Sequence, residues 1–223
     1  MKIAIQGYEA SFHSIAARQL FGEGCELVFC KTFKQVFAAL EDDDADKAVV
    51  AIENTLYGSI NEVYDLLLKH DFSITAEAYE QIGLHLLGLE SAEFEDITDV
   101  FSQAPALGEA DNFLTEKLPN TERHEHVDTA LAAKEVSSWN KKQNAAIASE
   151  AAAKTYTLRI LAPNIETHHE NYTRLIALGK SNDTEEAEKT SVVFQTADKP
   201  GALYEALGVF VKFGANLTKL ESR

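Results

Sequence analysis

Residues 2–52 read KIAIQGYEASFHSIAARQLFGEGCELVFCKTFKQVFAALEDDDADKAVVAI, and this stretch decides the fold class. Short apolar runs that suit buried strands alternate in it with apolar residues at helical spacing. The order is strand, helix, strand, helix, strand, with elements expected at 2–6, 11–21, 26–30, 32–40 and 47–52. Such alternation is typical of a mostly parallel sheet with helices on both faces.

A second α/β unit follows the first. After a helix expected at 61–69, two closely spaced apolar runs at 72–78 and 82–89 lead to a turn signal at 91–96. Beyond this turn the pattern predicts strands at 99–102, 121–127, 144–148 and 158–161, and helices at 105–117, 129–139 and 149–156. A polar connector then returns the chain to a strand near Tyr172.

Two doubly wound lobes with a cleft between them are therefore expected. Lobe 1 would hold about 1–76 and 166–180, and lobe 2 about 77–165. Ligands of open α/β sheets bind at the carboxyl ends of the strands, so the cleft is the expected binding site.

The C-terminal part has a different organisation. Residues 181–189 are polar and acidic, which indicates a linker. A strand at 190–196, a helix at 201–213 and a strand at 216–221 are expected after it. These would form a small α+β unit.

The composition excludes several classes of partner. The 223 residues carry a formal net charge of −16, which disfavours nucleic acid and anionic membranes because both require a basic surface. The apolar runs are far shorter than the roughly 20 residues that span a bilayer. No export signal follows Met1, so a soluble, cytoplasmic protein with reduced Cys25 and Cys30 is expected.

Polar residues follow the third expected strand directly. Glu53, Asn54 and Thr55 come at its end, with Gly58 close behind. This places carboxylate, amide and hydroxyl groups at the carboxyl edge of the sheet, where ligands bind. The same residues would also be explained if Asn54 or Thr55 only capped a turn.

A second group of polar residues precedes the apolar run 175–178. Asn171, Tyr172, Thr173 and Arg174 bring a hydroxyl and a guanidinium together where the chain re-enters the sheet. In an extended strand, Thr173 and Arg174 point to opposite faces. The alternative is that Thr173 is an ordinary β-branched strand residue and Arg174 a surface charge.

The first loop and the histidines offer weaker signals. Gly7 and the hydroxyl of Ser11 lie at a strand-to-helix turn, where backbone N–H groups can bind an anion. The further glycines of a dinucleotide fingerprint are absent, which disfavours nucleotides. The pairs His124 with His126 and His168 with His169 lack the spacing of a helical metal site, so no metal is expected.

Taken together in order, these motifs resemble the prephenate dehydratase family with its C-terminal ACT regulatory domain. The resemblance rests on Glu53-Asn54-Thr55 with Gly58, on Asn171, Thr173 and Arg174, and on Gly201-Ala202-Leu203 and Glu221-Ser222-Arg223. It covers essentially the whole chain and implies a periplasmic-binding-protein-like catalytic domain over 1–180. The linker 181–189 and a partial, ferredoxin-like ACT domain over 190–223 would follow.

This resemblance implies an activity and roles for individual residues. The family converts prephenate to phenylpyruvate, water and carbon dioxide in L-phenylalanine biosynthesis, without metal or organic cofactor. Thr173 would assist the departing hydroxide. The implied catalytic residues are Glu53, Asn54, Ser102 and Thr173, and the implied substrate-binding residues are Gly7, Ser11, Thr55, Asn171 and Arg174. The implied allosteric site for phenylalanine comprises Gly201, Ala202, Leu203, Glu221, Ser222 and Arg223.

Several positions depart from the family pattern. Ser102-Gln103-Ala104-Pro105 stands where the family has Ser-His-Pro-Gln, and Glu109 stands where a glutamine is usual. Leu175 replaces a phenylalanine, Ala10 replaces a glycine, and His13-Ser14 reverses the commoner order. The altered loop keeps arogenate dehydratase open as an alternative, and a non-catalytic two-lobed binding module is the other.

The resemblance also implies assembly and regulation. An ACT domain usually continues beyond the position of Arg223, so an unfinished unit would leave strand edges and an apolar helix face uncovered. We therefore expect a homodimer or homotetramer. L-Phenylalanine is the expected effector, with feedback weakened or absent in this form.

Overall fold

A computed structural model describes residues 1–180 and 188–221. The chain divides between residues 183 and 184 into a large unit and a small C-terminal unit. The large unit consists of two α/β lobes, each built on its own sheet.

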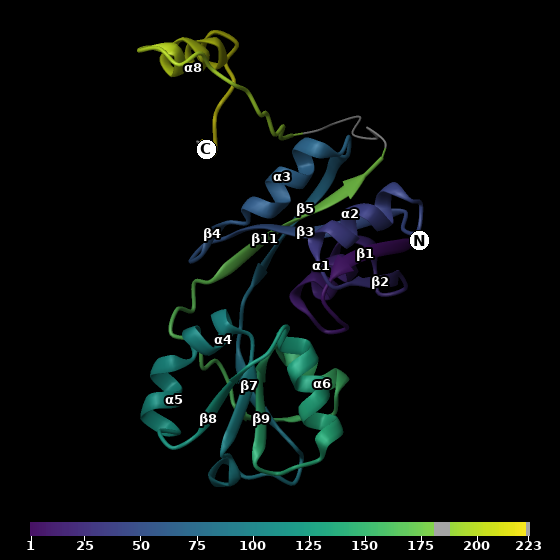
Figure 1. Ribbon diagram of the computed structural model, residues 1–223, viewed down its shortest axis with the longest axis vertical. Coiled ribbons are helices and arrows are strands. Elements are labelled where there is room, and N and C mark those ends of the chain that lie inside the picture. The colour runs from purple at the N-terminus through teal and green to yellow at the C-terminus, as the bar shows by residue number, and fades with distance from the viewer. Residues whose placement is uncertain (181–187, 222–223) are drawn as a thin grey trace. The chain divides into compact units, whose positions relative to one another are not determined.

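The sheet of the first lobe is parallel on one side and antiparallel on the other. Its main path has the order β2-β1-β3-β11-β5 (Figure 1), and the short β4 pairs with β3. The first three strands are parallel, and β11 runs antiparallel to both of its neighbours. The strands are β1 (Lys2–Gln6), β2 (Glu26–Cys30), β3 (Lys47–Asn54), β4 (Gly58–Ser59), β5 (Ser73–Gln81) and β11 (Tyr172–Gly179).

Helices cover both faces of this sheet, as expected. Helix α1 (Phe12–Phe21) contributes Ala16 and Ala17 to the core on one face. Helices α2 (Phe33–Glu41) and α3 (Asn61–Lys69) pack on the other face. The hydroxyls of Ser11 and Thr32 accept N–H groups of the first turns of α1 and α2, which fixes where each helix begins.

The second lobe has a five-stranded sheet in the order β10-β6-β9-β7-β8. Its strands are β6 (His85–Gly88), β7 (Asp99–Ser102), β8 (Glu122–Glu125), β9 (Asn144–Ala148) and β10 (Arg159–Ala162). Helices α4 and α5 lie on one face of it and α6 on the other (Figure 1). Helix α7 shares the core cluster of α6. They are α4 (Ala104–Glu109), α5 (Asp111–Lys117), α6 (Thr129–Trp139) and α7 (Glu150–Thr155), with a short 3-10 turn η1 (Phe94–Asp96) before β7.

Two expectations about boundaries need correction. The helix expected at 105–117 is two helices that meet at Ala110. Strand β5 continues to Gln81 and belongs to the first sheet along its whole length, so the first lobe extends beyond residue 76. The register with β11 extends β5, because each further residue gains a ladder partner.

The two segments that cross between the lobes, near residues 81–82 and 169–171, are hydrogen-bonded to each other. Ile82 donates its N–H to the carbonyl of Asn171 at 2.8 Å, and Gln81 Nε2 donates to the carbonyl of His169 at 2.9 Å. A second connection comes from the β1–α1 loop, whose carbonyls at Glu9 and Ala10 accept hydrogen bonds from Tyr156 and Ser149 of the second lobe.

Over residues 188–221 the small unit contains one helix, α8 (Ala202–Lys212). The strands expected at 190–196 and 216–221 are not formed within the described residues of this unit. A strand needs the backbone of a neighbour to complete its hydrogen bonds, and these residues supply none. Large apolar side chains are exposed here, among them Val192, Val193, Phe194, Tyr204, Val209, Val211 and Phe213.

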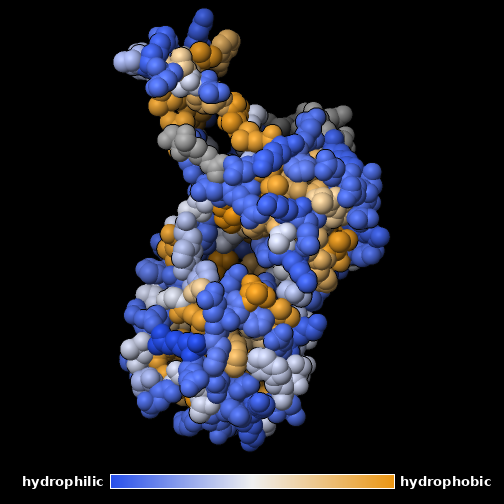
Figure 2. All heavy atoms as spheres, viewed as in Figure 1, coloured by the Kyte–Doolittle hydropathy of each residue, from blue (hydrophilic) through white to orange (hydrophobic). Residues whose placement is uncertain are grey.

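The surface of the large unit is mainly hydrophilic. On the face seen in Figure 2, hydrophilic residues cover most of the large unit and apolar residues lie in separate groups. No helix in the described ranges is long and apolar enough to cross a membrane.

Candidate functional site

The site is built by an irregularity in β3. Arg174 of β11 faces Glu53, whereas the next residue, Leu175, faces Ala51, so Ile52 is an extra residue in β3. Such a bulge changes which face the following side chains occupy. It brings Asn54 to the face covered by α1, directly opposite Thr173.

Three in-register rows of side chains cross β3, β11 and β5 on this face. The first consists of Val49, Ala177 and Ala76, and the second of Ala51, Leu175 and Ala78. The third row is polar and consists of Asn54, Thr173 and Glu80. We call it the polar row.

Hydrogen bonds fix the first two members of the polar row. Asn54 Nδ2 donates to Thr173 Oγ1 at 3.0 Å and to Asn171 Oδ1 at 2.7 Å. Asn54 Oδ1 accepts the N–H groups of Leu56 and Tyr57, so Asn54 also caps the turn after β3. The same side chain thus caps the turn and holds Thr173, and a catalytic role for Asn54 stays a prediction.

Thr55 and Asn171 support this arrangement from outside. The N–H of Thr55 donates to the carbonyl of Tyr172 at 2.9 Å, and Thr55 Oγ1 accepts the N–H of Tyr172 at 3.0 Å. Asn171 is 2% exposed and holds the amide of Asn54. The N–H and hydroxyl of Thr55 and the Oδ1 of Asn171 are therefore engaged in joining β3 to β11.

Glu80, the third member, was not recognised in the sequence. It faces Thr173 across the β5–β11 ladder. Burial raises the pKa of its carboxyl group. The sequence does hold a signal for it. Ala76, Ala78 and Glu80 are every second residue of one strand, so Glu80 is expected on the same face as the two alanines, where an acidic residue is unusual.

Glu53 and Arg174 lie on the opposite face. Arg174 forms an ion pair with Glu77, with Nη2 to Oε2 at 2.8 Å and Nε to Oε2 at 2.9 Å. Its charge is therefore already balanced. Neither Glu53 nor Arg174 shares a face with Thr173, which argues against the roles that the sequence suggested for them beside it.

The β1–α1 loop offers less to an anion than expected. The N–H of Gly7 donates to the carbonyl of Cys30, and that of Ser11 donates to the carbonyl of Tyr8. Ser11 is 4% exposed and caps α1 through its hydroxyl. Helix geometry leaves the N–H groups of Phe12 and His13 without intrahelical partners, so they are the remaining donors at this positive helix end.

Gly7 instead marks a close approach of the second lobe. It has a φ of +102°, and a Cβ placed on it would lie 3.0 Å from Asp128 Oδ2. Asp128 caps α6 by accepting the N–H of Leu131 at 2.9 Å. Burial raises the pKa of Asp128.

The Ser102 loop does not supply a free hydroxyl. Ser102 is 0% exposed, and its Oγ donates to the carbonyl of Ile147 at 2.6 Å. In this structure the Ser102 hydroxyl therefore bonds within the second sheet, and its catalytic role stays a prediction. Glu109, 8% exposed, accepts from the N–H of His168 and lies 3.1 Å from His168 Nδ1.

His13 lies behind the bulge and is partly buried. Its Nε2 accepts the N–H of Ala51 at 3.1 Å. Since β1 pairs with β3 only as far as Val49, that N–H lies beyond the ladder and would otherwise be without an acceptor. Burial lowers the pKa of His13 to about 4, so the imidazole is neutral.

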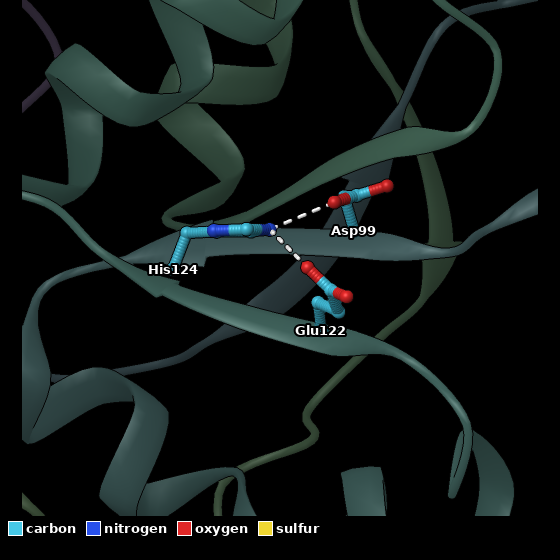
Figure 3. A group of neighbouring side chains, drawn as sticks. All are labelled: Asp99, Glu122 and His124. Atoms are coloured by element: carbon cyan, nitrogen blue, oxygen red, sulfur yellow. Dashed lines mark hydrogen bonds and ion pairs between the residues drawn. The ribbon is translucent and has the colours of Figure 1, made fainter.

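One histidine has acidic neighbours that the sequence analysis did not foresee. His124 Nε2 lies 2.7 Å from Asp99 Oδ1 and 3.9 Å from Glu122 Oε2, all on the second sheet (Figure 3). Hydrogen bonds from Thr98 and then from His124 lower the pKa of Asp99. The Nε2–Oδ1 distance is that of a direct hydrogen bond, and the Glu122 side chain is 81% exposed. The group is thus explained as a surface ion pair.

The residues expected at an allosteric site belong to the small unit. Gly201 precedes α8 with a φ of +85°, and Ala202 begins the helix. Leu203 is exposed, as is Glu221. Ser222 and Arg223 lie outside the described residues.

Comparison with models of known families matches residues 3–183 to prephenate dehydratase. The chain is similar to the bifunctional chorismate mutase/prephenate dehydratase of Aquifex aeolicus, with 39% identity over all of this chain and 61% of that protein. It is equally similar to arogenate dehydratase/prephenate dehydratase 2 of Arabidopsis thaliana, a chloroplastic protein, with 39% identity over all of this chain and 58% of that one. The chain thus spans about six tenths of the length of these relatives.

Solved structures share the two-lobed architecture. The quorum-quenching acylase GqqA aligns with all of this chain and 81% of its own, with a TM-score of 0.82 and 29% identity. The prephenate dehydratase of Arthrobacter aurescens, solved in complex with L-Phe, aligns with all of this chain and 75% of its own, with a TM-score of 0.86. Its identity of 24% shows a common fold.

Proposed function

The chain belongs to the prephenate dehydratase family, and from this premise we propose that it converts prephenate to phenylpyruvate, water and carbon dioxide. The observation that carries the proposal is the 3.0 Å hydrogen bond from Asn54 to Thr173 Oγ1. It joins two residues 119 positions apart, both of which belong to the motifs of the family resemblance. The activity would be that of a carbon–oxygen lyase in L-phenylalanine biosynthesis.

The chemistry requires little beyond a well-placed donor. Loss of the ring hydroxyl and the ring carboxylate makes the product aromatic, so the driving force lies in the substrate. The enzyme must assist departure of hydroxide. Because Asn54 occupies an acceptor position on Thr173 Oγ1, the Thr173 O–H remains available to donate to the departing oxygen.

The substrate is an anion and the chain is acidic, so local positive potential must bind it. With Arg174 paired to Glu77, we propose that the first turn of α1 provides this potential. A helix that follows a parallel strand begins at that strand's carboxyl edge, where Asn54 also lies. The substrate's carboxylates would meet the amides of Phe12 and His13 there.

Arogenate dehydratase is the second candidate. The observation that favours it is the 39% identity to a plant protein named for both activities. Arogenate carries an amino group where prephenate has a keto oxygen. The buried carboxyl groups of Asp128 and Glu109 would suit an ammonium group better than a neutral keto oxygen.

Regulation and assembly are proposed from the small unit. L-Phenylalanine would bind near Gly201, Ala202, Leu203 and Glu221 of an ACT domain, in a homodimer or homotetramer. The support is the family resemblance of these residues and the exposed apolar surface of this unit.

One assay tests the activity and separates the candidates. Purified protein is incubated with prephenate and, separately, with arogenate, and phenylpyruvate and phenylalanine are measured against the uncatalysed reaction. A higher kcat/KM for prephenate supports the proposal, and a higher value for arogenate supports the second candidate. Binding of either compound without turnover would indicate a non-catalytic binding module.

A further inference from the structure

Glu80 occupies a position that packing alone does not explain. On the face covered by α1, the residues of the first two rows are alanine, valine and leucine, which pack against Ala16 and Ala17. The third row is polar on all three strands. Two of its members, Asn54 and Thr173, are bonded to each other, and Glu80 is the third.

The ladder places Glu80 beside Thr173. The two residues are direct partners in the antiparallel β5–β11 pair. Side chains of such partners share a face, and their Cβ atoms lie about 4.5–5.5 Å apart. Asn54 approaches Thr173 Oγ1 from β3, on the other side, so the flank toward β5 is the one Glu80 can reach.

The carboxyl group of Glu80 is poorly solvated. Its Oε1 is buried and has no hydrogen-bond partner among the residues that the structure describes. Burial raises its pKa, and no charged group contributes to the shift. A buried carboxyl without a cation is stabilised by holding a proton.

Neighbouring charges are engaged elsewhere. On α1, His13 is neutral and Arg18 pairs with Glu9. On β11, Arg174 pairs with Glu77 of β5 on the opposite face of the sheet. In the crossing segment, His169 lies 3.1 Å from Glu166. None of these pairs offers a partner to Glu80.

We propose that Glu80 is the proton reservoir for Thr173 in the dehydration, and this inference rests on the proposed function. Prephenate is a dianion and phenylpyruvate a monoanion, so forming carbon dioxide and water consumes one proton. A threonine hydroxyl is too weak an acid to supply it alone. A protonated carboxyl group next to it removes that difficulty.

The step balances in atoms and charge. The ring C–O bond breaks and its electrons leave with oxygen, which takes the hydroxyl proton of Thr173 and departs as water. At the same time the Glu80 carboxyl proton moves to Thr173 Oγ1. The C–C bond to the ring carboxylate breaks, its electrons complete the aromatic ring, and carbon dioxide leaves. Glu80, left as a carboxylate, regains a proton from solvent.

The pH profile of kcat tests this role. In the wild type, kcat for prephenate should fall as pH rises and Glu80 loses its proton. Glu80→Gln cannot donate, so its kcat should be about 10²-fold lower at acidic pH and should not vary with pH as Glu80 titrates. Glu80→Asp should keep the pH dependence at a reduced rate. Glu62→Gln, an exposed change on α3, should behave as the wild type.

A double-mutant cycle shows whether Glu80 acts through Thr173. On the Thr173→Ala background, Glu80→Gln should add little, because the relay is already broken. Full additivity would mean that Glu80 acts independently of Thr173 and would overturn the proposal. Wild-type kcat and pH profile in Glu80→Gln would overturn it as well. So would a loss confined to arogenate, which would mean that the carboxylate binds an ammonium group.

Infrared spectroscopy separates this inference from the proposed function. A difference spectrum between the wild type and Glu80→Gln should show a protonated carboxyl band at mildly acidic pH that disappears on titration. If the spectra show Glu80 as a carboxylate at every pH, the proposal that it stores a proton is wrong, even if the enzyme is active. If the wild type fails to turn over prephenate and the band is present, the proposed reaction fails while the protonation of Glu80 stands.

Discussion

Thr173 is held by a hydrogen bond whose direction determines what its hydroxyl can do. Asn54 Nδ2 can only donate, so Thr173 Oγ1 accepts, and the Thr173 proton remains available for another oxygen. An identical threonine with its own proton bonded to a carbonyl would be inert as a donor. Such a contact fixes Thr75, whose Oγ1 lies 3.4 Å from the Ala177 carbonyl.

Removing the Thr173 hydroxyl should abolish most of the activity. Thr173→Ala is expected to lower kcat for prephenate by about 10²–10⁴-fold with little change in KM, because the interaction is made mainly in the transition state. Thr173→Ser keeps the hydroxyl and should retain much more activity. Steady-state kinetics of both variants provide the measurement. Full activity in Thr173→Ala would exclude Thr173 from the mechanism.

Asn54 can be tested by changing only its donor. Asn54→Asp keeps an oxygen to accept the N–H groups of Leu56 and Tyr57 but loses the donation to Thr173. We expect a loss in kcat of at least about 10-fold and destabilisation of about 1–3 kcal/mol, since a carboxylate would face Asn171 Oδ1. The exposed change Asn112→Asp is the matched control and should alter neither. Unchanged kcat in Asn54→Asp would mean that Thr173 is oriented by other groups.

At the scale of elements, the sequence predicted strands and helices better than side-chain functions. Helix 129–139 and strand 144–148 were predicted at their observed bounds, because apolar periodicity reports the buried face of an element. The bulge at Ile52 could not be predicted, since it depends on the partner strand β11, about 120 residues later in the chain. The faces of Glu53 and Asn54, and hence their functions, follow from that bulge.

Other errors have similar causes. Strands expected at 190–196 and 216–221 have suitable residues but lack a neighbouring strand within the described part of their unit. Ser102 and Asn54 are each the last residue of an apolar strand, so the sequence alone does not distinguish them. Only the structure shows that the Ser102 hydroxyl bonds to a carbonyl inside the second sheet.

The contact between α1 and β3 should make stability depend on pH. The pKa of His13 is about 4 in the folded protein against 6.5 for an ordinary histidine, so the unfolded chain binds more protons between these values. The neutral form of His13 therefore contributes about 3 kcal/mol to the free energy of unfolding above about pH 6.5. This contribution is lost as the pH falls toward 4.

Denaturant unfolding at several pH values measures this effect. His13→Gln retains an acceptor for the Ala51 N–H but does not titrate, so its free energy of unfolding should decline less on acidification. The raised pKa of Asp128 acts in the opposite direction in both proteins and cancels in the difference. Parallel pH profiles of the two proteins would contradict a neutral, partly buried His13.

The turn between β1 and α1 should not tolerate a side chain at Gly7. Gly7→Ala combines an unfavourable φ of +102° with a contact of 3.0 Å to Asp128 Oδ2, so we expect destabilisation of about 1–3 kcal/mol. Gly24→Ala is the matched control, because an added Cβ there would meet nothing within 4 Å. Its effect should stay within about 0.5 kcal/mol. Equal denaturation midpoints for the two variants would contradict this account of the turn.

At the scale of the whole molecule, the two units differ in how far their apolar side chains are buried. The large unit buries leucine, isoleucine and phenylalanine in four clusters, two on each sheet. In the small unit, Tyr204, Val211 and Phe213 are 82%, 79% and 78% exposed. Exposed apolar area of this kind is covered in most proteins by a partner, because burial stabilises by about 25 cal/mol per Å².

We therefore expect the chain to self-associate through the small unit. Light scattering coupled to size exclusion at micromolar concentration should give at least twice the chain mass of 24.6 kDa. The double substitution Val211→Glu and Phe213→Glu should shift the protein toward the monomer, because each carboxylate would have to be desolvated in the interface. Turnover should change little, since the polar row lies entirely in the large unit.

A matched substitution distinguishes a specific interface from general charge repulsion. Leu68→Glu introduces the same charge at an apolar residue of α3 that is 59% exposed, and it should leave the mass unchanged. If Leu68→Glu dissociates the assembly as effectively as the double variant, added negative charge on an already acidic chain is the cause. A monomeric wild type at micromolar concentration would show that the apolar side chains of α8 remain exposed to water without a second copy.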